Sequence, residues 1–153
     1  MEVRSRYNPA YEGETLRKFL AGAPIDLSWM QDWLRMVREA ATEGRCFARV
    51  RVVDLPMSEW NRYSYALAQH NIAAGEDIRY LERGNAAGLP DCDYWLFDSS
   101  KLVVMRFDEA DRFVGGEDIE DPAEIVKANY WRDAAWHKAA RRDDFATELP
   151  IRH

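Results

Sequence analysis

Arginine is the residue type whose spacing most clearly indicates a binding chemistry in this sequence. Arg49 and Arg51 alternate along an apolar run, so they share one face of a predicted strand, and Arg79 lies on what we expect to be the neighbouring strand. Guanidinium groups form paired hydrogen bonds with phosphate and carboxylate groups, so this face predicts a site for a small anionic ligand. The alternative is a solvent-exposed sheet face on which the arginines pair with nearby Glu76 and Asp77.

Two further residues belong to the candidate ligand-binding set. Arg62 lies on the helix predicted between these strands, and Asp98 directly follows the apolar run YWLF. Aspartate in such a position commonly closes a turn through its own backbone, but strand ends are also where sites form in α/β proteins. If Asp98 or His70 did acid–base work on a phosphate held by the arginines, the protein would be an enzyme acting on a phosphoester or nucleotide. This alternative stays open.

The familiar sequence motifs of catalysis and cofactor binding do not occur in this chain. It has no glycine-rich dinucleotide or phosphate loop, no serine nucleophile elbow, no HExxH zinc motif and no calcium loop. Three histidines and two cysteines, at positions 46 and 92, are too few and too scattered for a typical metal centre. We therefore name no catalytic residue, no metal and no cofactor, and the balance favours a protein that is not an enzyme.

The charge balance limits the partners that can be expected. Acidic residues outnumber Lys and Arg by 27 to 21, for a net charge of −6. Binding to nucleic acid or to an anionic membrane surface needs an excess of basic groups, so we expect no direct contact with either. The sequence contains neither an apolar leader nor an apolar run long enough to span a membrane, which predicts a soluble, cytoplasmic protein.

Periodicity and end signals predict the elements that must position these residues. Helical spacing of apolar residues predicts helices at 14–21, 28–43 and 58–74, each followed by a glycine, and a last helix after the Asp-Pro pair at 121–122. Alternating or continuous apolar runs predict strands near 46–55, 77–81, 94–97, 102–107 and 112–117.

The order of these elements predicts a single α/β domain over residues 14–141, between an irregular arm at 1–13 and a polar tail at 142–153. The strand–helix–strand unit at 46–81 favours a parallel crossover, whereas the later strands are joined by short turns and should be antiparallel. We expect a central mixed sheet of about five strands flanked by helices. The apolar run at 94–97 is typical of a strand covered on both faces.

Four phrases, in this order and spacing, resemble a known protein family: RVRVV at 49–53, WNRYSYALAQHNIAAGEDIRYL at 60–81, DYWLFD at 93–98 and VVMRFDEADRFVGGEDIEDP at 103–122. The family is a domain-of-unknown-function family common in actinomycetes, and the resemblance runs from the first helix to Ala139. Its members are typically encoded near helix-turn-helix regulators and small partner proteins. The resemblance implies a regulatory or accessory protein and carries over no catalytic residue, because the family has no established reaction.

A weaker likeness, at the level of the fold alone, is to degenerate phospholipase-D-like sensor domains. Active members of that group carry an HxK motif, whereas the residues after His70 and His137 read NI and KA. This departure from the motif argues against phosphodiesterase chemistry even if the fold is shared.

These observations lead to one principal functional hypothesis and two alternatives. The principal hypothesis is a regulatory or accessory protein that acts through protein–protein contact, with a DNA-binding regulator as its partner. It would sense a small anionic ligand on the arginine-bearing sheet face. The alternatives are the enzyme described above and a toxin-like component of a two-gene module.

Overall fold

The computed structural model describes residues 1–9 and 13–146. In chain order the elements are α1 (Gly13–Leu20), the 3₁₀ turn η1 (Ser28–Met30), α2 (Gln31–Thr42), β1 (Ala48–Val53), α3 (Glu59–Ala74), β2 (Asp77–Glu82), the 3₁₀ turn η2 (Arg83–Asn85), β3 (Tyr94–Phe97), β4 (Lys101–Phe107), β5 (Phe113–Ile119), α4 (Pro122–Lys138), β6 (Ala140–Arg141) and α5 (Arg142–Ala146). Within the described ranges, no helix combines the length and the apolar character needed to cross a bilayer.

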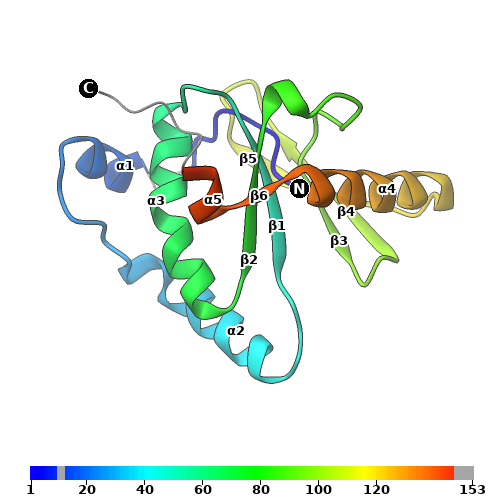
Figure 1. The fold of residues 1–153 in the computed structure, drawn as a ribbon, viewed down its shortest axis with the longest axis horizontal. Coiled ribbons are helices and arrows are strands. Elements are labelled where there is room, and N and C mark those ends of the chain that lie inside the picture. The colour runs from blue at the N-terminus through cyan, green and yellow to red at the C-terminus, as the bar shows by residue number, and fades with distance from the viewer. Residues whose placement is uncertain (10–12, 147–153) are drawn as a thin grey trace.

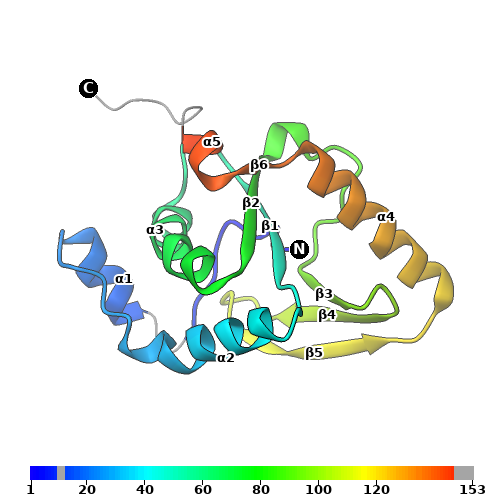
Figure 2. The same ribbon diagram turned by 60° about the horizontal axis from the view of Figure 1, so that its bottom comes forward.

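The first sheet has the strand order β1-β2-β6 and lies between helices. β1 and β2 are parallel and are joined by α3, as the strand–helix–strand pattern predicted, and β6 pairs with β2 in the antiparallel sense. Figure 2 shows α3 and α5 on one side of this sheet and α4 on the other. Val50 and Val52 accordingly pack toward Ala135 of α4, whereas Ile78 and Tyr80 pack toward α3 and α5.

The second sheet, β3-β4-β5, is antiparallel throughout and packs one face on α4 (Figure 1). Tyr94 and Leu102 are buried there against Ala128 of α4. The other face is only partly covered, because Phe97 remains 46 % exposed. The prediction that strand 94–97 is covered on both faces is therefore wrong, and its outward aromatic side chains are free to line a surface.

The prediction of a single central sheet of about five strands is also wrong. The edge of β1 that could have received β3 is occupied by the first residues of the chain. Glu2 donates its backbone N–H to Val50 O at 2.9 Å and accepts from Val52 N–H at 2.8 Å, while Met1 O accepts from Tyr94 N–H at 3.1 Å. Residues 1–3 thus form a strap between the two sheets, and each sheet keeps three strands.

The two ends of the predicted domain are more closely integrated than expected. Among residues 1–9, placed in an irregular arm, the only strand pairing is the bridge of Glu2 to Arg51, yet Val3 is buried. Residues 142–146, placed in the polar tail, form α5, whose Phe145 is buried and stacks on Tyr80. The rest of the predicted tail, residues 147–153, lies outside the described residues.

The ends of α3 place the start of β2 with little freedom. Ser58 caps the helix by accepting from Asn61 N–H at 3.1 Å. Gly75 ends it with φ +114°, and a Cβ at that position would lie 2.9 Å from Ala41 Cβ on α2. A residue without a side chain is therefore required for the two helices to approach. The turn delivers Glu76 directly to the sheet face that α3 covers.

Candidate functional site

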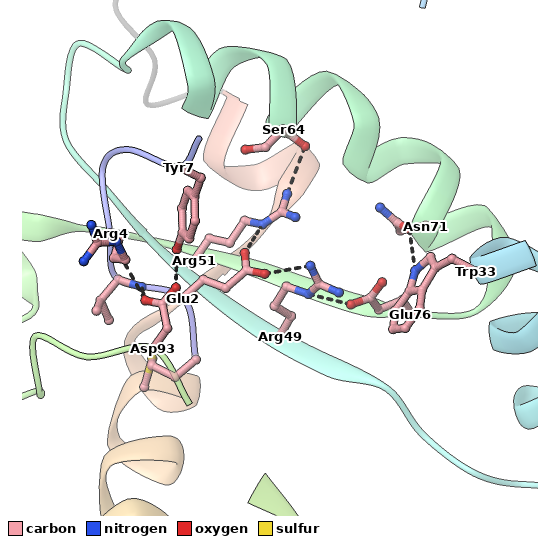
Figure 3. A network of polar contacts seen from close by, with 12 residues as sticks. Glu2, Arg4, Tyr7, Trp33, Arg49, Arg51, Ser64, Asn71, Glu76 and Asp93 are labelled. Atoms are coloured by element: carbon pink, nitrogen blue, oxygen red, sulfur yellow. Dashed lines mark hydrogen bonds and ion pairs between the residues drawn. The ribbon is translucent and has the colours of Figure 1, made fainter. Parts of the chain in front are cut away.

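The most charged part of the interior lies on the face of the first sheet that is turned toward α3. Arg49 and Arg51 extend from β1 to this face, and the carboxylate of Glu2 lies between them (Figure 3). Glu2 Oε1 accepts a hydrogen bond from Arg49 Nη1 at 2.7 Å, and Glu2 Oε2 accepts one from Arg51 Nε at 2.6 Å. One carboxylate therefore links two guanidinium groups that are two residues apart on the strand.

Further contacts hold each guanidinium in place. Arg49 Nε lies 2.7 Å from Glu76 Oε1, and Arg51 Nη1 donates to the backbone oxygen of Ser64 at 2.9 Å. Arg51 is only 9 % exposed. Because arginine does not lose its charge in proteins, such burial requires counter-charges, and the two glutamates supply them. We call Glu2, Arg49, Arg51 and Glu76 the arginine–glutamate network.

The two carboxyl groups of the network respond differently to burial. Burial by itself raises the pKa of Glu2, but the guanidinium groups of Arg49 and Arg51 outweigh it and lower that pKa to about 2. For Glu76, burial dominates and raises the pKa despite the nearby arginines. Its Oε2 atom has no hydrogen-bond partner among the described residues. The network thus combines two permanent positive charges with one firmly ionised carboxylate and one that accepts a proton more readily.

A cavity of about 600 Å³ lies beside this network, between α2, α3, the N-terminal residues and β3. Its aromatic walls are formed by Tyr7, Trp29, Trp33, Trp60 and Trp95. The Arg49 Cζ atom lies 5.9 Å from the centroid of Trp33 and 5.8 Å from that of Trp95, within the range of cation–π contact. Trp33 is fixed in turn by donating from Nε1 to Asn71 Oδ1 at 3.0 Å. We call this cavity the tryptophan pocket.

A second anchor, Asp93, holds the strap and the residues after it against the pocket. Asp93 Oδ1 accepts from the backbone N–H groups of Val3 at 2.7 Å and Arg4 at 3.3 Å, and Oδ2 accepts from the Tyr7 hydroxyl. Burial raises the pKa of Asp93, and the hydrogen bonds from Tyr7 and Val3 only partly offset it. The aromatic ring of Tyr7 is thereby fixed as one wall of the cavity.

The structure separates Arg79 from the other arginines of the predicted site. Arg79 pairs in register with Val50, and side chains of paired residues lie on the same face of a sheet. It therefore faces α4, opposite to Arg49 and Arg51, and its Cζ atom lies 3.9 Å from the centroid of the Trp136 ring. The prediction that Arg79 shares a binding face with Arg49 and Arg51 is wrong, because the parallel register was not available from the sequence.

The other predicted residues also lie away from the tryptophan pocket. Arg62 is exposed on α3, and Asp98 is exposed in the turn between β3 and β4, where it adopts φ +49°. His70 lies near the end of α3 beside Gln69. The lining of the pocket includes none of the three.

Sequence reasoning missed Glu2, Tyr7, Trp33 and Trp95 as members of the site. Glu2 and Tyr7 stand in a segment without periodicity, so no pattern tied them to a strand some 50 residues away. The sequence pattern predicted that the tryptophans are ordinary core residues. One signal was available: two arginines that alternate with valines on a strand need carboxylate partners if that face is covered.

The arrangement is suited to binding. It offers apolar ring surfaces, fixed guanidinium groups and a partly open cavity whose volume is within the range of small-molecule sites, about 300–1,000 Å³. The described part of the chain contains no group of three or more His, Cys, Asp or Glu side chains that could hold a metal ion.

Comparison with known proteins gives a match to a family model. A family model described as "Domain of unknown function (DUF6879)" matches residues 1–147. No curated protein and no solved structure matches the chain significantly. The predicted resemblance to a domain-of-unknown-function family is confirmed at that level. The actinomycete source, the neighbouring regulators and the phospholipase-D-like likeness stay predictions.

Proposed function

We propose that this chain, which belongs to the DUF6879 family of domains of unknown function, is a regulatory protein that binds a small organic anion in the tryptophan pocket. The observation that carries the proposal is the combination of aromatic walls with two fixed guanidinium groups in a cavity of about 600 Å³. Sites for small molecules are mostly apolar and orient the ligand through a few polar groups. The carboxylate or phosphate of the ligand would face the arginines, and its apolar part would lie between the indole rings.

The hydrogen-bonding capacity of the network supports an anionic ligand. Within the described chain, the bonds of Arg49 use Nη1 and Nε, and those of Arg51 use Nε and Nη1. Both arginines line the tryptophan pocket, where a ligand oxygen would meet their guanidinium groups. Protonation of Glu76, which burial favours, would leave the network with a net positive charge. An anion would then restore the balance.

The regulatory part of the proposal rests on the resemblance described from the sequence and on charge. A net charge of −6 disfavours DNA as the direct partner but suits contact with a basic DNA-binding protein. We propose that a helix-turn-helix regulator is that partner and that ligand binding changes their association. The protein would act in the cytoplasm.

The geometry gives less support to the enzyme alternative. That reading requires Arg49, Arg51 or Arg79 to hold a phosphate beside Asp98 or His70. Asp98 lies in an exposed turn, and neither it nor His70 lines the pocket that contains Arg49 and Arg51. No observation in the structure favours the toxin-like alternative.

Ligand binding can be tested with a panel of aromatic and aliphatic carboxylates and phosphates, read by thermal shift and by tryptophan fluorescence. We expect at least one compound to bind, and to bind at least tenfold more weakly to Arg49→Lys, which keeps the charge but loses the planar fork. The matched control is Arg79→Lys on the opposite face, which should bind as the wild type does. Equal affinity in all three proteins, or the failure of every compound in the panel to bind, would refute the proposal.

The partner can be tested separately by calorimetry with the regulator encoded beside the gene. We expect association that the identified anion strengthens or weakens severalfold, because linkage requires ligand and partner to affect each other's affinity. If the two purified proteins associate neither in the presence nor in the absence of the anion, the regulatory part of the proposal is incorrect.

A further inference from the structure

A second cavity, of about 300 Å³, lies next to the tryptophan pocket, where the segment at residues 7–9 meets the start of α3 and the open face of the second sheet. Its wall contains five aromatic rings, from Tyr7, Trp60, Trp95, Phe107 and Phe113. We call it the aromatic recess. It shares Tyr7, Trp60, Trp95 and Glu2 with the tryptophan pocket but contains neither Arg49 nor Arg51.

Four of the five rings, all except that of Trp95, contact one another in a continuous row. Tyr7 lies 5.5 Å from Trp60 and 5.6 Å from Phe107, measured between centroids, and Phe107 lies 5.9 Å from Phe113. Each ring is turned by 44° to 73° relative to the next, so they do not stack into a closed block. Aromatic faces carry partial negative charge, and several faces around one cavity attract a cation.

The charged side chains of the recess have the same sign as the ring faces, while the α-ammonium group of Met1, another lining residue, donates to Tyr94 O at 2.9 Å. Among the described residues, Glu2, Asp93 and Asp111 line it, and no lysine or arginine does. These carboxyl groups already have partners. Glu2 bonds to Arg51, and Asp111 forms an ion pair with Arg4. Asp93 accepts from the Tyr7 hydroxyl within the recess and from the backbone N–H of Val3. A small, strongly hydrated cation would find no free carboxylate to replace its water. A weakly hydrated organic cation loses little water and gains the ring faces.

The protein already places one organic cation on this wall. The guanidinium of Arg4, which does not line the cavity, lies with its Cζ atom 4.4 Å from the centroid of Phe107. From the ring geometry, the charge of the lining and this internal example, we propose that the aromatic recess binds the trimethylammonium head group of a small molecule. Aromatic cages of this kind are suited to quaternary ammonium groups. The proposal is independent of anion binding in the tryptophan pocket.

The test is calorimetry and saturation-transfer NMR with choline and tetramethylammonium. The reference compound is the uncharged analogue of choline, in which a tert-butyl group replaces the trimethylammonium group at nearly the same size. We expect both cations to bind and the uncharged analogue to bind about tenfold more weakly, because the charge supplies part of the affinity. Equal binding of choline and its analogue would show an apolar pocket only and would overturn the proposal, as would failure of both cations to bind.

Two variants show whether the binding occurs in the recess. Phe113→Leu removes a ring that is 55 % exposed, so the fold should tolerate it, and we expect choline to bind about fivefold more weakly. The matched control is Tyr130→Leu, which removes a 69 % exposed ring on α4 and should leave binding unchanged. If both variants bind choline like the wild type, the site lies elsewhere and the assignment is wrong. Dependence on Arg49 would instead indicate the tryptophan pocket.

Discussion

Arginine side chains on the two faces of the first sheet are held by different kinds of contact. On the face toward α3, Arg51 is 9 % exposed and is held by Glu2 and by the backbone of Ser64. On the face toward α4, Arg79 lies over the ring of Trp136, and its nearest carboxylate oxygen, on Asp77, is 3.6 Å away. The first arrangement is a network of short charged bonds, and the second is a cation placed over an aromatic ring.

The difference shows what makes a buried arginine part of a site. Arg51 needs a counter-charge from a distant segment, and supplying it draws the N-terminal strap and the aromatic walls to the same place. Arg79 is half-buried against Trp136 of α4, and its nearest carboxylate, Asp77, lies on its own strand, so it takes no counter-charge from a distant segment. The face of the sheet on which an arginine lies depends on strand register. That face determines whether the arginine pairs with carboxylates or packs on an aromatic ring.

The largest loss of stability is expected from Arg51→Met, which removes the central guanidinium and leaves Glu2 paired with Arg49 alone. We expect the free energy of unfolding to fall by about 3–5 kcal/mol, because breaking a buried pair leaves an uncompensated charge. Urea denaturation followed by tryptophan fluorescence measures the change. A loss no larger than that of Arg79→Met would mean that the two faces do not differ in energy.

An intermediate effect is expected from Glu2→Gln, which keeps the shape of the side chain but removes the charge between the arginines. The cost at neutral pH should be about 2 kcal/mol. Because the folded pKa of Glu2, about 2, lies below its ordinary value of 4.5, the stabilisation is complete above pH 4.5 and is lost as the pH falls toward 2.

The difference in unfolding free energy between wild type and Glu2→Gln, measured across that range, isolates the contribution of this carboxyl. Asp93 and Glu76, whose pKa values are raised, change with pH in the opposite sense, but they are present in both proteins and largely cancel. A difference that stays constant with pH would contradict the assigned role of Glu2.

The smallest effect is expected on the other face. Arg79→Met loses a cation–π contact while keeping most of its packing, and should cost about 1 kcal/mol by the same urea assay. Arg62→Ala, at an exposed position on α3, is the reference and should change stability by less than about 0.5 kcal/mol. A cost for Arg79→Met as large as that of Arg51→Met would remove the distinction between a charged network and a ring contact.

Local patterns predicted the individual elements well, because caps and periodicity act over a few residues. The cap at Ser58 and the glycine stop at Gly75 are where the sequence places them. Asp121 caps α4, with Pro122 following, in the same way. The parallel β1–β2 pair and the antiparallel hairpins were also predicted, since short turns and a crossover helix leave few alternatives.

Contacts between distant segments could not be predicted in this way. The division into two sheets depends on which strand edge is already occupied, and Glu2 occupies the edge of β1. Arg79 was assigned to the wrong face because a one-residue change of register reverses every side chain of a strand. For the candidate site, Arg49 and Arg51 were predicted as ligand-binding residues, whereas the aromatic walls were not, because large aromatic side chains are most often core residues.

The strap at residues 1–3 also has a consequence for the order in which the chain matures. Glu2 bonds to a residue 49 positions later and Val3 to one 90 positions later, so both are synthesised well before their partners. Closing such long loops is slow relative to forming the helices. A nascent chain that stops before Asp93 and Trp95 can form α2 and α3, but the tryptophan pocket is complete only when the two sheets have been tied together.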